Sequence, residues 1–423
     1  MKELQVKSKV LDGINLVRDL VERSYGQYSG NILLKVLLDH DVTTTRYTKD
    51  GYTIVNNISS DDLYKQSGID LCKEVANRVN QLCGDSTSTV ILLFSALCNN
   101  IMIASQSGLS SKEISDILQD DYSIIVNYMT KELNPVMNNN DDNKLCAIIS
   151  AKDEELGNLI YDMINESSPS VAVNITYDSY NHYDITTGCK ISINNSVETK
   201  QEYHDISIVS DTKDHDMNTI VFSLNPIKLE NSININLQNL GSLIANRLLE
   251  TIPKLANNDG KVKSVIVDKD CIIIVPYDDM LDTIKELYTK ELNSMPNPNE
   301  RHIQQFMVKF LQSQSATLYL TADTESSYLE IKDRAEDSIN STKSAMLYGI
   351  IAGRGETIHN YISQRSCKLS NYSKSALDVP YRLLLDNNKN SVDPIRSWQI
   401  SLHTAYTQAL LFAELQGGYL GEK

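Results

Sequence analysis

The chain has 423 residues, 41% hydrophobic and 22% charged, so it can bury more than one core and two or three domains are expected. Its formal net charge of −16 disfavours binding to nucleic acid or to an anionic membrane, because both need a basic surface. Seven scattered cysteines without CxxC spacing argue against a disulfide framework or a zinc site. The lysine-rich start has no apolar segment behind it, so neither a signal peptide nor an anchor is predicted, and we expect a cytoplasmic protein.

The first third of the chain is predicted to be mainly helical, because its apolar residues recur at helical spacing. Helices are expected over residues 10–20, 71–82, 86–105 and 111–133. Strands are expected over residues 31–39 and 52–55, with a turn at the sequence TKDG just before the second strand.

A polar break at residues 134–143 leads into a mixed middle section. Its expected elements are a helix at 151–165, a strand at 171–177, a β-rich region after Gly188, a strand pair at 264–275, and helices at 240–255 and 278–293. A linker rich in Pro and Asn at 294–300 precedes helices at 301–312, 328–350 and 394–415. Helix-rich ends around a mixed middle predict a multi-domain α+β fold in which one domain interrupts another.

Residues 83–90, with the sequence CGDSTSTV, place hydroxyl groups and free amides at the start of the predicted long apolar helix. Such a helix end suits phosphate, and Asp85 can hold Mg²⁺ against phosphate oxygens. The alternative is a plain N-cap formed by Asp85 or Ser86. No GxxxxGK[ST] sequence occurs, which excludes an ordinary P-loop.

The run GDSTSTV resembles the GDGTTT phosphate-binding motif of GroEL-type (group I) chaperonins, and TKDG at 48–51 resembles a second motif of that family. Further similar segments follow in the family's order: SYGQYSGN at 24–31, ISA at 149–151 with LGNLI at 156–160, DRAEDS at 333–338, GIIAGRG at 349–355 and VDP at 392–394. The chain therefore resembles a divergent, shortened chaperonin.

The resemblance implies a Mg²⁺-dependent ATPase in which Asp85 binds the metal and the catalytic residues Asp50 and Asp337 position or deprotonate the attacking water. Nucleotide contacts are implied for Tyr25, Gly26, Asp85, Ser86, Thr87, Ser88, Thr89, Ser150, Gly353, Gly355 and Asp393. Each acid has a structural alternative: a turn residue for Asp50, an exposed helical acid for Asp337 and an N-cap for Asp393.

The resemblance also implies a domain layout. The equatorial domain is expected at 1–133 and 353–423, the small αβ intermediate domain at 134–188 and 313–352, and a shortened, β-rich or αβ apical domain at 189–312. The apical domain is expected to bind non-native polypeptides. Candidate contacts are Leu243, Ile244, Leu248, Leu281 and Ile284, and the alternative is that these side chains form the domain's own core.

The assembly implied is a homo-oligomeric ring of about seven subunits in the cytoplasm, or in the host cytoplasm if the chain is phage-encoded. Whether one or two rings form, and whether a co-chaperonin lid is used, stays open.

Three departures from the family pattern bear on activity. Arg354 replaces the middle glycine of the family's triplet, Gln27 and Tyr28 replace its Pro and Lys in the first nucleotide loop, and the segment at 385–393 is short. Arg354 and the short segment favour an alternative function, a chaperonin-fold structural or scaffolding oligomer with weak or lost ATPase. The retained Asp50, Asp85 and Asp337 favour the enzyme. An unrelated metal-dependent phosphohydrolase would require the ordered matches to be accidental.

Overall fold

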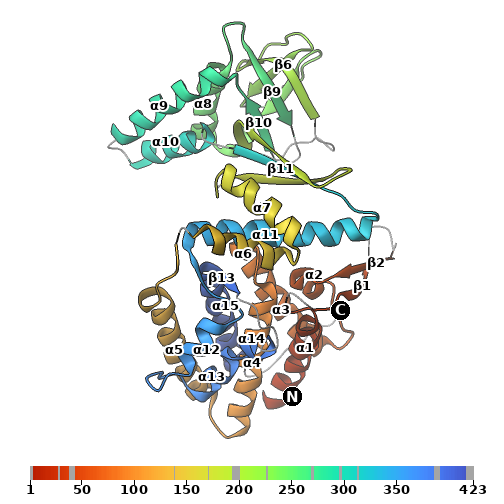
Figure 1. Cartoon of the computed structure of the whole chain (residues 1–423), viewed down its shortest axis with the longest axis vertical. Helices are drawn as coiled ribbons and strands as arrows, with labels where there is room; N and C mark the ends of the chain where they lie inside the picture. Colours follow the sequence, from red (N-terminus) through yellow and green to blue (C-terminus); the bar gives the residue numbers. More distant parts are fainter. Residues whose placement is uncertain are drawn as a thin grey trace. The chain divides into compact units, whose positions relative to one another are not determined.

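The computed structural model describes residues 3–26, 29–37, 43–137, 139–169, 171–192, 201–224, 227–267, 271–294, 298–311, 314–384 and 391–415 (Figure 1). The chain divides into two compact units. The first unit comprises residues 1–169, 177–182 and 319–423, and the second comprises 170–176 and 183–318. The departures at Gln27, Tyr28 and residues 385–390 lie outside the described residues.

Long helices form the main core of the first unit, and α4 is its central helix. They are α1 (Glu3–Arg23), α3 (Leu63–Cys83), α4 (Thr87–Gln106), α5 (Ser111–Asn127) and α15 (Ile395–Glu414). Helix α4 packs against α1, α3 and α15, and its apolar residues from Val90 to Leu97 are buried in this core. It is long and apolar enough to cross a membrane, but 67% of its most apolar stretch is buried inside the protein, as expected of a core helix.

A small β-hairpin precedes the first short helix of this unit. Strands β1 (Ile32–Leu37) and β2 (Thr43–Thr48) are antiparallel, and α2 (Gly51–Asn56) follows directly. The predicted strand at residues 52–55 is therefore wrong. The Asp50 carboxylate accepts hydrogen bonds from the amides of Tyr52 (3.1 Å) and Thr53 (2.7 Å), and this N-cap starts a helix in a sequence whose β-branched residues favour a strand.

Helix α11 (Glu325–Tyr348) connects several parts of the first unit (Figure 1). It packs against α6 (Asn140–Ala151), α7 (Glu154–Glu166), α15 and β2. Its C-terminus leads into β12 (Ile350–Ala352), which pairs antiparallel with β13 (Val392–Pro394) just before α15. The remaining described elements near this end are the helices α12 (Glu356–Ile362), α13 (Asn371–Leu377) and α14 (Val379–Leu383).

Two further sheets complete the description. Strands β3 (Ala172–Tyr177), β11 (Gln314–Leu320) and β4 (His182–Thr187) form a three-stranded sheet in that order. The six-stranded sheet of the second unit has the order β5-β10-β9-β6-β7-β8, with β6, β7 and β8 mutually parallel. Its strands are β5 (Cys189–Ser192), β6 (Gln201–Val209), β7 (Thr219–Ser223), β8 (Ile233–Asn236), β9 (Lys261–Val267) and β10 (Cys271–Val275).

The second unit has its own core between this sheet and the helices α8 (Ser242–Thr251), α9 (Asp278–Ser294) and α10 (Pro298–Leu311). Leu248, Leu281 and Ile284 belong to that core, at 0%, 5% and 8% exposure, so the expectation that they contact a polypeptide is corrected. Their apolar stripes hold the helices on the sheet. Ile244 is partly buried against the same core, and Leu243 is 67% exposed.

Two glycines allow α1 and α3 to cross closely. A Cβ atom on Gly68 would lie 2.0 Å from the Val10 carbonyl oxygen, and one on Gly13 would lie 2.0 Å from the Lys65 carbonyl oxygen. The backbones of the two helices therefore touch, and any side chain at either position forces them apart.

We predict that Gly68→Ala destabilises the first unit by about 1–3 kcal/mol, because the backbone cannot yield as a flexible side chain can. The midpoint of urea unfolding, followed by circular dichroism, measures this. Gly30→Ala is the matched control, since nothing lies within 4 Å of a Cβ there, and it should leave the midpoint unchanged. Equal midpoints for the two variants would contradict the close crossing.

Candidate active site

A cleft in the first unit gathers most of the predicted site residues. Three of its edges are the turn between α3 and α4, the end of α6, and the polar face of α11. The lining residues are Ser24, Tyr25, Gly26, Lys49, Gly51, Asp85, Ser86, Thr87, Ser88, Thr89, Cys146, Ile149, Ser150, Lys152, Asp337, Ser341, Arg354, Leu384, Ser391, Val392, Asp393, Pro394 and Trp398.

The α3–α4 turn presents backbone amides to this cleft. Gly84 and Ser86 have positive φ angles of 62° and 67°, which turns the chain sharply around Asp85. Ser86 occupies the N-cap position of α4 without a side-chain cap bond, and the first helical bond runs from the Val90 amide to the Ser86 carbonyl oxygen. The amides of Thr87–Thr89 therefore precede the helical ladder. This arrangement fits an anion better than the plain N-cap alternative does.

Helix α11 is fixed to that turn by side-chain hydrogen bonds. The Ser341 hydroxyl donates to Asp85 Oδ2, and the Asn340 amide donates to the Gly84 carbonyl oxygen at 3.2 Å. Ser150, at the end of α6, donates to Ser341 Oγ at 3.1 Å. Asp337 lies one helical turn before Ser341, and both line the cleft. Ser341 was not predicted from the sequence, although its i+4 spacing from Asp337 was a usable signal.

Asp50 lies next to the cleft, but its carboxylate caps α2 and is not among the lining groups. Its neighbours Lys49 and Gly51 do line the cleft. A Cβ atom on Gly51 would lie 2.3 Å from Ser88 Oγ, so a glycine here lets α2 approach the start of α4. The structural role of Asp50 is therefore to cap α2, where the sequence had suggested a turn residue. The part of Asp50 in catalysis stays a prediction.

The cleft concentrates negative charge. Burial, together with the nearby charges of Asp50 and Asp85, raises the pKa of Asp337 well above its usual range. Burial likewise raises the pKa of Asp85, although the bond from Ser341 opposes this. Perturbed carboxylates clustered in one cleft are typical of functional sites, because burying several like charges destabilises the fold.

Lys152 is a lysine in this acidic cleft that the sequence analysis missed. It follows the ISA segment directly and ends α6 with a left-handed backbone (φ 54°). Burial lowers the pKa of its ammonium group, while the charges of Asp337, Asp50 and Asp85 oppose that shift. No ion pair within 4.0 Å joins it to another residue of the described chain, so its ammonium is free to meet an anionic ligand.

Tyr25, Arg354 and Asp393 also line the cleft. The Tyr25 hydroxyl is 3.3 Å from Thr89 Oγ1, and Trp398 Nε1 donates to Asp393 Oδ2 at 2.9 Å. Pro394 is the N-cap of α15, which removes the N-cap alternative for Asp393. Burial raises the pKa of Asp393 to about 6.

Gly353 and Gly355 flank the cleft without lining it. Gly353 packs against Ser391 and Val392, where a Cβ atom would lie 2.6 Å from Ser391 Oγ, and Gly355 (φ 76°) begins α12. Between them Arg354, with φ 56°, lines the cleft.

A magnesium ion fits the donor set. No group of three or more His, Cys, Asp or Glu side chains in the described residues could hold a metal by itself. Mg²⁺ commonly uses only one or two carboxylates together with phosphate oxygens and water. Asp85 accepts bonds from Ser341 and from the Ser86 amide (2.5 Å), which orients the carboxylate and leaves it acceptor capacity for a cation.

Comparison with known proteins finds that the chain is similar to chaperonins. No family model matches the chain. The chaperonin GroEL 1 of Prochlorococcus marinus (strain MIT 9515) is 21% identical over 464 aligned positions, covering 96% of this chain and 77% of that protein. Two crystal structures of the chaperonin gp146 from the Pseudomonas aeruginosa bacteriophage EL 2, both in the presence of ATP-BeFx, are also similar. Their TM-scores are 0.69 and 0.65, each at 15% identity over 99% of this chain and 98% of that one.

The chain therefore has the chaperonin fold, and the predicted multi-domain α+β class is confirmed. The resemblance to a divergent, shortened GroEL-type chaperonin is confirmed as well.

We predict that Asp393→Asn stabilises the protein at neutral pH. The folded-state pKa of about 6 lies above the unfolded value, so the native state binds more protons and wild-type stability falls as pH rises from about 4 through 6. Asparagine keeps an acceptor for Trp398 without the charge. After allowance for partial solvent exposure, the gain is about 1–2 kcal/mol at pH 7.5 and near zero at pH 4.

Thermal melts at the two pH values measure this gain. Asp62→Asn is the opposite-sign control, since amide hydrogen bonds from Lys65 and Tyr64 lower the pKa of that exposed capping carboxylate. It should lower the melting temperature at pH 7.5. If the Asp393→Asn protein melts below wild type at pH 7.5, the ionised carboxylate does not destabilise the folded protein and the prediction is wrong.

Proposed function

We propose that the protein is an ATP-dependent chaperonin, a Mg²⁺-dependent ATPase that binds non-native polypeptides in a ring assembly. The observation that carries this proposal is the meeting of Asp85, Asp337 and the amides of Thr87–Thr89 at one cleft. The chaperonin fold of the whole chain supports it. The fold alone does not identify a function, and the cleft supplies the chemistry.

In this proposal the start of α4 binds phosphate oxygens through backbone amides and the hydroxyls of Thr87, Ser88 and Thr89. Asp85 would hold Mg²⁺, which supplies charge neutralisation on the phosphate oxygens. Lys152 and Lys49, which also line the cleft, add positive charge. Phosphoryl transfer requires mainly positioning and charge neutralisation, and these groups provide both.

Asp337 is the residue proposed to accept a proton from the attacking water. A general base works best with a pKa near the operating pH, and burial beside other acids raises the pKa of Asp337 in that direction. Asp50 supports the site from the cap of α2. Ser150, Tyr25, Gly26 and Asp393 complete the predicted nucleotide contacts, with Gly353 and Gly355 positioning Arg354.

The remaining parts of the proposal concern partners and place of action. We expect a homo-oligomeric ring of about seven subunits, acting in the cytoplasm or in a phage host's cytoplasm, without nucleic acid or membrane. In the second unit, Leu243 on α8 and Leu287 on α9 are exposed and can contact a non-native chain, with the partly buried Ile244 beside them.

A second candidate function is a scaffolding oligomer with weak or lost ATPase. Arg354 favours it, because a bulky cation with a left-handed backbone lines the cleft between two glycines. A guanidinium can also bind phosphate, so Arg354 is compatible with the first candidate.

Steady-state ATP hydrolysis tests the enzyme. Wild type should turn over ATP with Mg²⁺ and stop when the metal is chelated, and Asp337→Ala should lower kcat by about 100-fold or more, as expected for loss of a general base. Glu336→Gln is the matched control, because this neighbour on α11 is exposed and should retain activity. An inactive wild type that still assembles would favour the scaffolding candidate.

Assembly is tested separately by light scattering after size exclusion, with and without ATP. A particle of about seven or about fourteen subunits is expected, since head-to-tail contacts that close give a ring. A monomer at every concentration would rule out the ring.

A further inference from the structure

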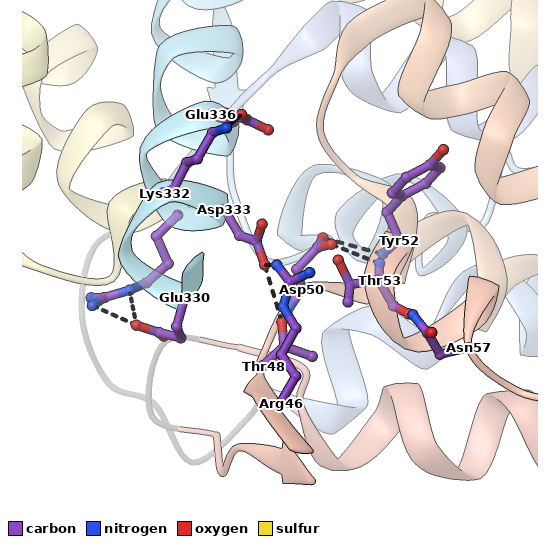
Figure 2. Close-up of polar contacts among 11 residues, drawn as sticks. Arg46, Thr48, Asp50, Tyr52, Thr53, Asn57, Glu330, Lys332, Asp333 and Glu336 are labelled. Atoms are coloured by element: carbon purple, nitrogen blue, oxygen red, sulfur yellow. Dashed lines mark hydrogen bonds and ion pairs between the residues drawn. The ribbon is translucent and has the colours of Figure 1, made fainter. Parts of the chain in front are cut away.

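A chain of polar contacts connects β2 to α11 beside the cleft. Figure 2 shows it: Arg46 Nη2 donates to Asp333 Oδ2 at 2.5 Å, and the Thr48 hydroxyl donates to the same oxygen at 3.4 Å. Thr48 Oγ1 in turn accepts the Asp50 amide at 3.0 Å. We name Arg46, Thr48 and Asp333 the clasp. Through it the residue that begins α2 is linked to α11.

Two residues of the clasp each lie four positions before a proposed catalytic acid. Arg46 lies four residues before Asp50, and Asp333 lies four residues before Asp337. Residues i and i+4 of a helix share one face, so the face of α11 held by Arg46 is the face that presents Asp337. Any rotation of α11 about its axis that moves Asp333 therefore moves Asp337 as well.

The clasp is shielded from solvent. The side chains of Arg46 and Asp333 are 20% and 17% exposed, and Thr48 is fully buried. Burial raises the pKa of Asp333 to about 6 even though Arg46 opposes the shift, and the charge of Asp50 adds to it. Without Arg46, the partly buried Asp333 carboxylate would repel the neighbouring acids. The Arg46–Asp333 pair therefore contributes more to stability than a surface ion pair does.

Arg334, the residue after Asp333, makes a second contact that fixes α11. Arg334 Nη1 donates to the Ala151 carbonyl oxygen at 3.3 Å, and its guanidinium pairs with Glu330 on α11 at 2.9 Å. Asp333 and Arg334 thus dock the same turn of α11 onto β2 and onto the end of α6. The end of α6 is also where Ser150 and Lys152 line the cleft.

We propose that the clasp is a positioning device for hydrolysis, which holds α11 on β2 so that Asp337 faces the bound nucleotide. Arg46 and Asp333 touch neither nucleotide nor water in this scheme and act through the placement of Asp337. The inference rests on the proposed ATPase function. It predicts a loss of turnover without a comparable loss of nucleotide binding, because the amides proposed to bind phosphate belong to α4, which packs on α1, α3 and α15 and carries no clasp residue.

The test compares Arg46→Gln, Arg46→Lys and the double variant Arg46→Gln/Asp333→Asn in the full chain. Arg46→Gln should lower kcat about 10- to 100-fold, the cost of a misplaced catalytic group, while the Kd for ATP, measured by isothermal titration calorimetry, changes less than about 3-fold. The double variant should regain much of the kcat, because it also removes the unpaired carboxylate. Arg46→Lys should keep most of it.

Lys332→Gln is the matched control, since it removes a cation of an exposed pair one residue away on α11. It should match wild type in kcat and Kd. Arg46→Gln with wild-type kcat but a lower melting temperature would show that the pair is only structural and would overturn the positioning role. Turnover and binding lost together would place Arg46 at the nucleotide and would overturn it too. A wild type without turnover would overturn the ATPase itself, and the clasp with it.

Discussion

The cleft depends on one contact, the hydrogen bond from Ser341 of α11 to the Asp85 carboxylate in the α3–α4 turn. Asp85 is near in sequence to the amides that begin α4, whereas Ser341 of α11 lies 256 residues later along the chain. A helix is stiff over its length, so contacts on both sides of Asp337, at Asn340 and Ser341 and at Asp333, together fix where Asp337 lies. The turn proposed to bind phosphate and the proposed base lie at one cleft because of this contact.

Bringing these elements together buries several acids near one another, which destabilises the folded chain. Asp85, Asp337, Asp333 and Asp393 all have raised pKa values in the folded chain, and burial is the largest cause for each. Protein cores normally avoid such groupings, because each like charge destabilises the others. Lys152 and Arg46 offset part of the charge, and a bound cation would offset more. A fold that keeps an unfavourable cluster in an open cleft is consistent with a site whose ligand supplies the missing positive charge.

The two units differ in how much of the resemblance they carry. All the ordered motifs, from residue 24 to residue 394, fall in the first unit, which holds the entire cleft. The second unit has an independent core around its six-stranded sheet, built from residues without recognisable family motifs. Hydrophobic patterning is enough to specify such a core, since many apolar sequences of suitable volume pack equally well. The residues that carry the resemblance are therefore those of the first unit, and many of them line the cleft.

Sequence by itself determined the long helices and the position of the turn proposed to bind phosphate, because both follow from local rules. Helical periodicity placed α4 and α15 within a residue or two, and the run of hydroxyl residues ahead of an apolar helix indicated a helix start that can bind an anion. The same local rules failed at residues 52–55, where β-branched residues indicated a strand and the Asp50 cap produced a helix.

Only the tertiary structure decided what distant residues do together. Three findings depend on contacts between elements that are far apart in the sequence. They are the burial of Leu248, Leu281 and Ile284, the position of Lys152 among the acids, and the pairing of Arg46 with Asp333. Side-chain exposure and electrostatic environment are properties of the packed chain, and periodicity shows which residues share a face without showing what that face meets.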